Sequence, residues 1–328
     1  MAKENYSMRA IRDTISASPS ILALSDGRAG NVAMAEGLAQ AVARETGGTW
    51  RGATIEATPA LVRLPPRVWT WLPASLALGQ APVPDATVVI GAGRRVAPLV
   101  AALERTGRAR GVQILDSGLP AVRFAAVVTP AHDGVSGPNV ISTLGSVHRI
   151  APETLADGAA AWRETFTAMP TPRIAVLLGG ATRRRAVSPE RIDALAADLA
   201  GLGGSLIVTA SRRTGDDNIA RLRAALPGAW FWDGTGPNPY AGMLALADAV
   251  IVSDDSVNMM SEAASCPAPV AVWPLLQEGG KIASFRETLY AAGVAEPFAN
   301  RLPERTGSPL AETARAAREV VALLKGTV

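Results

Sequence analysis

The residues best suited to chemistry in this sequence gather between Asp233 and Ala263. A continuous apolar run, Ala249–Ser253, is typical of a central parallel strand, and the small polar sequence Asp254-Asp255-Ser256 follows it. A helix is expected next, and a helix that starts at a strand end offers free N–H groups and a positive dipole to an anion. This pattern favours a nucleotide or phosphate site. The alternative is that the three polar residues only cap the helix.

Two other apolar runs of the second half also end in residues that suit a phosphate. Glycines and arginines follow the run that ends at Leu178, and a serine with two arginines follows Ala210. Guanidinium groups and hydroxyls fit a diphosphate, and Glu262 is placed to accept hydrogen bonds from ribose hydroxyls. For any single arginine, a solvated surface position remains the alternative. The candidate donor-binding residues are Gly179, Gly180, Thr182, Arg183, Ser211, Arg212, Arg213, Asn238, Pro239, Tyr240, Ser256, Asn258, Met259 and Glu262.

The first half supplies residues that could bind and activate an acceptor. Asp26 and His132 are the candidate general bases for attack by a hydroxyl group. Asp26 is equally suited to cap a helix, and a lone loop histidine is more often structural. The remaining acceptor-side candidates follow strand-like runs and are Gly27, Arg28, Gly30, Asn31, Arg94, Arg95 and Asp133.

Composition excludes several classes of protein. The 328 residues, 48% of them hydrophobic, suffice for about two domains with buried cores. A net charge of +3 is too small to indicate nucleic-acid binding. One cysteine and two histidines exclude a disulfide framework and make a zinc site improbable, and the Asp254-Asp255 pair is a weak magnesium signal, so we expect no metal and no tightly bound cofactor.

The elements that position these residues alternate regularly along the chain. Strands are expected at 21–25, 50–57, 86–90, 112–116, 124–130, 173–180, 205–210, 229–232, 249–253 and 268–273, with helices between them. This alternation predicts an α/β fold of two doubly wound, Rossmann-like domains facing each other across a ligand cleft. The proline-bearing segment Thr165–Arg173 resembles a linker, which gives domains at 1–168 and 169–328. A C-terminal helix is expected near 310–324, and the sequence is compatible with packing of this helix on the first domain.

One apolar segment, Leu61–Leu78, is interrupted by three prolines and two arginines and is too broken to span a bilayer. A pair of core-packing helices is the favoured interpretation. The alternative is a peripheral membrane contact in which Trp69 and Trp71 enter the headgroup region. The first 20 residues are polar and mixed in charge, unlike a secretory signal, so we expect a cytoplasmic protein that acts at the inner face of the membrane if that contact exists.

Eight short motifs together resemble the elongated-mitochondria, or mitochondrial fission, family. They extend from about Ile21 to Trp273, and they are SDGRAGN (25–31), GAGRR (91–95), GPNV (137–140), VHR (147–149), LLGG (177–180), TASRRT (209–214), NPYAG (238–242) and DSVNMMSEA (255–263). The chain departs from the usual Gly-Gly-Pro-Ser of the family at Gly179-Gly180-Ala181-Thr182.

The resemblance implies a GT-B-like fold of the kind found in nucleotide-sugar glycosyltransferases. In that superfamily the C-terminal domain binds the donor, often through a glutamate placed like Glu262, the N-terminal domain binds the acceptor, and no tightly held metal is needed. The expected activity is therefore transfer from a nucleotide-sugar to an acceptor of lipid or cell-envelope type. The alternative is a non-catalytic GT-B-like scaffold that recruits a protein partner, which predicts a large exposed apolar patch.

Overall fold

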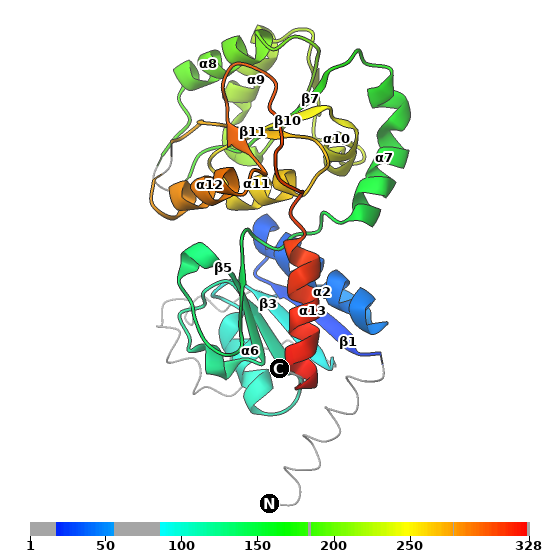
Figure 1. Ribbon diagram of the computed structural model, residues 1–328, viewed down its shortest axis with the longest axis vertical. Helices are drawn as coiled ribbons and strands as arrows, with labels where there is room; N and C mark the ends of the chain where they lie inside the picture. Colours follow the sequence, from blue (N-terminus) through cyan, green and yellow to red (C-terminus); the bar gives the residue numbers. More distant parts are fainter. Residues whose placement is uncertain (1–17, 56–85, 183–184, 278, 327–328) are drawn as a thin grey trace, which may run out of the picture. The chain divides into compact units, whose positions relative to one another are not determined.

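The computed structural model describes residues 18–55, 86–182, 185–277 and 279–326 (Figure 1). The chain divides into two compact units. The first unit comprises the residues up to Arg149 together with those from Ala311 onward, and the second unit runs from Ile150 to Leu310. The predicted segment 61–78, with Trp69 and Trp71, lies outside the described residues, as does Arg183.

The described part of the first unit contains a sheet of six parallel strands in the order β2-β1-β3-β4-β5-β6. Its elements in chain order are β1 (Ser20–Ser25), α2 (Ala29–Thr46), β2 (Thr49–Thr54), β3 (Val88–Ala92), α6 (Ala97–Arg105), β4 (Arg110–Ile114), the 3-10 turn η1 (Ala121–Arg123), β5 (Ala126–Pro130), the 3-10 turn η2 (Ala131–Asp133), β6 (Val140–Thr143) and α13 (Glu312–Lys325).

Strand β1 shows why this apolar sequence forms a central strand. Successive side chains point to opposite faces of a sheet, so a strand covered on both faces needs apolar residues throughout. Ile21 and Ala23 belong to the core that includes residues of α2 and α13, whereas Leu22 and Leu24 belong to the core that includes residues of α6. The helices α2 and α13 lie side by side on one face, as Figure 1 shows in blue and red.

The described part of the second unit has a matching sheet of six parallel strands, in the order β12-β11-β10-β7-β8-β9. Its elements are α7 (Pro152–Thr167), β7 (Arg173–Leu178), α8 (Pro189–Ala200), β8 (Ser205–Ala210), the 3-10 turn η3 (Arg212–Thr214), α9 (Asp216–Ala225), β9 (Trp230–Phe231), α10 (Tyr240–Leu246), β10 (Ala249–Ser253), α11 (Val257–Ala264), β11 (Val270–Trp273), α12 (Lys281–Ala291) and β12 (Glu296–Pro297).

The division between the units falls before α7, whereas the sequence suggested a boundary at 168. Helix α7 packs closely on α10, because Gly158 lies against Ala241 and Gly242, and the Trp162 side chain lies against Gly242. The proline-bearing turn at 168–172 therefore connects α7 to β7 inside one unit. Helix α13 returns to the first unit, as the sequence analysis allowed.

The expected strands agree with the structure to within a few residues, but two strands were not anticipated. Strand β6 has four residues and pairs with β5, and β12 has only two. Both are too short to show a periodic pattern of their own. No helix among the described residues is both long enough and apolar enough to cross a bilayer.

Candidate functional site

In the second unit, three neighbouring strands bring most of the predicted donor-binding loops to one edge of the sheet. The strand order reverses between β10 and β7, since the chain moves outward through β8 and β9 on one side and through β11 and β12 on the other. Open α/β sheets bind ligands in the crevice outside the carboxyl ends of the strands at such a reversal. The loops after β7, β8 and β10 meet at this point.

A buried carboxylate, Asp255, ties these loops together. Its Oδ2 accepts hydrogen bonds from the Gly180 amide at 2.9 Å and from Arg213 Nη2 at 3.0 Å, and its Oδ1 accepts one from Ser253 Oγ at 2.7 Å. Ser253 Oγ also accepts a hydrogen bond from the Gly179 amide at 2.7 Å. A Cβ at Gly179 would overlap the Asp255 carboxylate, so the close approach of loop and carboxylate requires glycine there.

The two arginines after β8 have different surroundings. Arg213 contacts Asp255, and its Nη1 donates to the carbonyl oxygens of Gly180 at 3.3 Å and Ala181 at 3.1 Å, so this guanidinium holds the loop after β7. Arg212 is exposed and makes no hydrogen bond or ion pair within the described ranges. Of the two, Arg212 is therefore the one with donors available for a phosphate. Ser211 accepts a hydrogen bond from the Arg213 amide and caps η3.

Helix α11 begins at the same edge. Ser256 caps it by accepting a hydrogen bond from the Met259 amide at 3.3 Å. Asp254 does not cap it: this fully buried carboxylate accepts a hydrogen bond from the Leu276 amide at 2.9 Å and pairs with Arg286. The capping alternative is thus correct for Ser256 and wrong for Asp254 and Asp255, whose carboxylates hold neighbouring loops.

A hydrogen bond joins the first residue of α10 to α11. The Tyr240 hydroxyl donates to Glu262 Oε2 at 2.8 Å, and Asn238 Oδ1 accepts a hydrogen bond from the Tyr240 amide at 2.9 Å. Burial, and secondarily the Glu262 carboxylate, raise the pKa of Tyr240 well above its ordinary value. Tyr240 therefore stays protonated and donates to Glu262 throughout the physiological range. Pro239 is buried, and Thr182, Asn258 and Met259 are half-buried.

The Tyr240→Phe variant should lower the free energy of unfolding by about 1.5–3 kcal/mol, because it removes a hydrogen bond to a charged group. Urea unfolding monitored by circular dichroism measures this loss. Tyr290→Phe is the matched control, since the Tyr290 hydroxyl makes no hydrogen bond with the described residues. Equal unfolding midpoints for the two variants would contradict the importance of the Tyr240–Glu262 contact.

In the first unit, the strand order reverses between β1 and β3, and Asp26 lies there. Its side chain is only 4% exposed and contacts two arginines, with Arg28 Nε at 3.5 Å and Arg95 Nε at 4.0 Å from Oδ2. Asn31 Nδ2 donates to Oδ1 at 2.7 Å. Asp26 does not cap α2, whose N-cap is Arg28. Its role as a general base stays a prediction, and its carboxylate already has three partners.

The other acceptor-side candidates are spread over several strand ends. Arg94 pairs with Asp116 after β4 at 3.4 Å. Asp133 accepts a hydrogen bond from Thr129 Oγ1 at 3.0 Å and lies with His132 in η2, after β5. Three strand spacings, roughly 14 Å, separate the ends of β1 and β5, so Asp26 and His132 cannot act as one pair. Gly27 has a φ of 77°, and Gly30 is in the first turn of α2.

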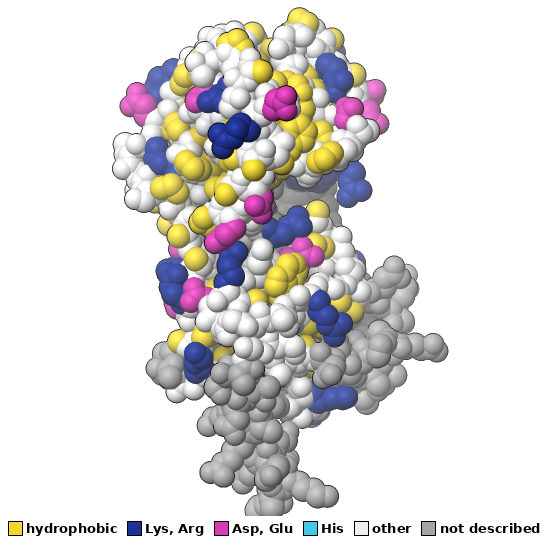
Figure 2. Space-filling view, turned by 90° about the vertical axis from the view of Figure 1, so that its right-hand side faces the viewer, with side chains coloured by type: hydrophobic (Ala, Val, Ile, Leu, Met, Phe, Trp, Pro, Cys, Tyr) yellow, Lys and Arg dark blue, Asp and Glu magenta, His cyan; other side chains and the backbone are white. Residues whose placement is uncertain are grey.

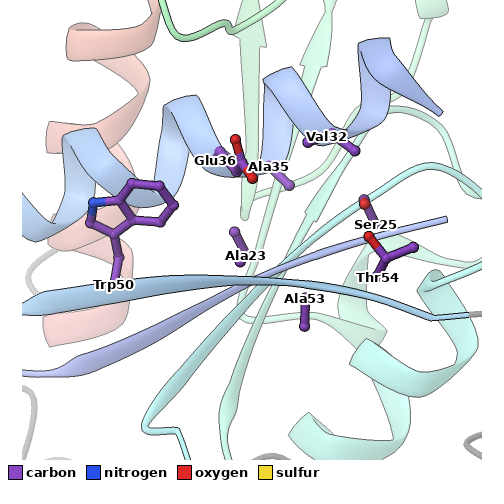
Figure 3. Close-up of a pocket in the computed structure, with 9 residues that line it drawn as sticks. Ala23, Ser25, Val32, Ala35, Glu36, Trp50, Ala53 and Thr54 are labelled. Carbon is purple, nitrogen blue, oxygen red and sulfur yellow. The ribbon is translucent and has the colours of Figure 1, made fainter. Parts of the chain in front are cut away.

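A pocket in the first unit was not anticipated from the sequence (Figure 3). It has a volume of about 370 Å³ and lies between α2 and strands β1 and β2. Trp50 lies at one end and the hydroxyls of Ser25 and Thr54 at the other, with the Glu36 carboxylate between them. None of the predicted site residues lines it. Trp50 is the second residue of β2, and the sequence of this strand contains no motif that could have indicated the pocket.

Comparison with known sequences gives two related findings. A sequence model of the family described as Mitochondrial fission ELM1 matches residues 29–324. The mitochondrial fission protein ELM1 of Arabidopsis thaliana is 28% identical over 273 residues, which cover 71% of this chain and 62% of that protein. The chain thus matches less than two thirds of the length of this relative.

Comparison with solved structures identifies the fold. The UDP-GlcNAc 2-epimerase from Methanocaldococcus jannaschii has a TM-score of 0.55 at 12% identity, with 91% of this chain and 98% of that chain covered. UGT89C1 from Arabidopsis thaliana, solved with UDP, has a TM-score of 0.50 at 11% identity, with 94% and 93% covered. The expected class, two Rossmann-like domains of the GT-B kind, is confirmed.

Proposed function

This chain belongs to the mitochondrial fission ELM1 family and has a GT-B-like fold, and from that premise we propose that it is a glycosyltransferase with a nucleotide-sugar donor. The donor binds the second unit, where the loops after β7, β8 and β10 converge. The acceptor binds the first unit. The reaction transfers the glycosyl group from the diphosphate to an acceptor hydroxyl, which loses its proton to a general base.

The observation that carries this proposal is the contrast between Arg212 and its neighbours at the strand reversal. Asp255, Arg213 and Ser253 use their polar atoms on one another and so fix the loops. Arg212 is left exposed on that fixed frame, at the same edge of the sheet as the start of α11. A preorganised frame with an available guanidinium is what a diphosphate requires.

The nucleoside end is assigned to Glu262 and the residues around it. Its carboxylate is held by Tyr240, so it is oriented before a ligand arrives. A carboxylate accepts hydrogen bonds from both ribose hydroxyls, which gives it a natural role in nucleoside binding. UDP is the first nucleotide to test, because UGT89C1 was solved with UDP and the epimerase is named for a UDP-sugar.

We further propose that the transfer needs no bound metal. Asp254 and Asp255, the acidic pair closest to the proposed diphosphate, are each paired with an arginine. Arg212 would then supply the positive charge that stabilises the departing diphosphate.

The scaffold alternative receives less support. A docking protein needs a contiguous apolar surface, whereas Trp50 and Val122 are the only exposed large hydrophobic residues in the described part of the chain. On the face drawn in Figure 2, charged side chains are interspersed among the hydrophobic ones. Because the chain matches only 62% of the length of its plant relative, the role of that protein is not carried over.

UDP at about 100 times its Kd should stabilise the protein by about 2.7 kcal/mol and raise its melting temperature by several degrees. Arg212→Ala should weaken UDP binding by roughly 10- to 100-fold, because a charge-assisted hydrogen bond is lost. Arg163→Ala is the matched control, since Arg163 is exposed in the same unit and its side chain has no partner in the described ranges.

Differential scanning fluorimetry with UDP, GDP, ADP, CMP and their sugars measures both effects. A melting curve unchanged by every nucleotide would refute donor binding. Binding of UDP without turnover of UDP-sugars, in the presence of an extract of envelope lipids, would instead favour the scaffold.

A further inference from the structure

The surroundings of Asp26 differ from those of the comparable carboxylate in the second unit. Asp255 is neutralised by one arginine, Arg213, and the Nη groups of that arginine are both engaged within the protein. Asp26 is approached by two arginines from two different loops, with Nε of Arg28 at 3.5 Å and Nε of Arg95 at 4.0 Å from its Oδ2. One buried carboxylate therefore faces two positive charges.

The two guanidiniums near Asp26 keep most of their donors available. The side chains of Arg28 and Arg95 are 54% and 42% exposed, and their Nη groups make no hydrogen bond with residues in the described ranges. Both Nε atoms lie near the same Asp26 oxygen, at 3.5 and 4.0 Å, so they are at most 7.5 Å apart. Asn31 satisfies the other oxygen of Asp26.

This arrangement exceeds what neutralisation of Asp26 requires. One arginine balances one carboxylate, as Arg213 does for Asp255, and a second leaves an excess positive charge at the surface. Two exposed guanidiniums with a common anchor present planar sets of N–H donors over a short span. Such sets match the oxygens of a phosphoryl group.

We propose that Arg28 and Arg95 form a binding site for a phosphoryl group of the acceptor, with Asp26 as the residue that positions both. This inference rests on the proposed function, because it names the chemical class of the acceptor: a hydroxyl compound that also carries a phosphate. The phosphate belongs either to a soluble sugar or polyol phosphate or to a lipid headgroup.

The test uses the full chain saturated with UDP, so that the second unit does not compete for phosphate. One arm titrates sn-glycerol 3-phosphate by isothermal titration calorimetry. The other arm sediments phosphatidylcholine vesicles with and without phosphatidic acid. The variants are Arg28→Gln, Arg95→Gln and their combination. Arg123→Gln is the matched control, because Arg123 lies in the same unit, before the start of β5, and its side chain has no partner in the described ranges.

Each single variant should weaken phosphate binding about tenfold and the double variant about a hundredfold, while the control stays within about twofold of the parent. Binding of glycerol phosphate identifies a soluble acceptor, and binding only of vesicles with phosphatidic acid identifies a lipid. Either result, if it depends on both arginines, supports the inference. Absence of binding in both arms, or binding that the double variant retains, overturns it.

The same experiment separates this inference from the proposed function. The affinity for UDP should be equal in the parent and in all Arg28 and Arg95 variants. Retained UDP binding without phosphate binding refutes only the acceptor site. Phosphate binding that depends on the two arginines, in a protein that UDP does not stabilise, refutes the proposed donor and leaves the phosphoryl site in place.

Discussion

Gly180→Ala is expected to lower the free energy of unfolding by about 3 kcal/mol or more and the melting temperature by about 10 °C. A Cβ at this position would overlap the backbone of Arg213 and Thr214, which no side-chain rotation relieves. The loop after β7 must then move away from η3. The Gly180 amide would lose its hydrogen bond to Asp255, and that carboxylate would be left buried with fewer partners.

Gly228→Ala controls for the general effect of adding a methyl group in this unit, since nothing lies within 4 Å of a Cβ there. Thermal unfolding followed by circular dichroism compares the two variants. We also expect Gly180→Ala to abolish stabilisation by UDP, because the loops that converge on Asp255 would separate. A Gly180→Ala protein that melts with the parent would show that the loops after β7 and β8 are not packed as described.

Arg286→Met should destabilise the protein by about 3–5 kcal/mol near pH 7, because it leaves the carboxylate of Asp254 buried without its cation. Burial raises the pKa of Asp254, and the Leu276 amide and Arg286 oppose that rise. A carboxyl group whose pKa is raised by folding contributes stability below its unfolded pKa, and that contribution is lost as the pH rises through the folded pKa. Removal of the cation raises the folded pKa further.

The loss caused by Arg286→Met should therefore shrink as the pH falls and Asp254, whose pKa burial raises, takes up a proton. Urea unfolding at several pH values measures this dependence. Adding Asp254→Asn should restore most of the stability, whereas Arg221→Met, which breaks the exposed pair with Asp193, should change the stability little because solvent screens that pair. A loss independent of pH, or a double variant no more stable than Arg286→Met, would contradict this account.

The strands were predictable because the central positions of a doubly wound sheet require apolar residues on both faces. The runs at 21–25 and 249–253 are buried throughout, as expected. The division between the units was harder to predict. The turn with Pro170 and Pro172 has the composition of a linker, but α7 is held to the second unit by close glycine contacts with α10. Contacts between helices that are far apart in the sequence cannot be recognised from local composition.

The location of the candidate site at the ends of certain strands could be predicted from the sequence, but the role of each residue there could not. Sequence placed Arg212 and Arg213 together, and both remain donor-site predictions. Only the geometry distinguishes them, because Arg213 is engaged with Asp255, Gly180 and Ala181 while Arg212 is not. Likewise, His132 and Asp26 were both plausible bases, and the strand order separates them. Pairings between loops depend on the order of strands, which a single sequence does not specify.

The return of α13 to the first unit has a consequence for biosynthesis. Ala316, Ala317 and Val320 are fully buried in the core that α2 and the first sheet share, and Thr313 accepts a hydrogen bond from the His148 amide at 3.0 Å. During translation, these residues leave the ribosome only after the whole second unit. The first unit therefore keeps the apolar face that α13 covers exposed until α13 has been synthesised. The second unit is one continuous segment, so it is able to complete its fold before the first unit does.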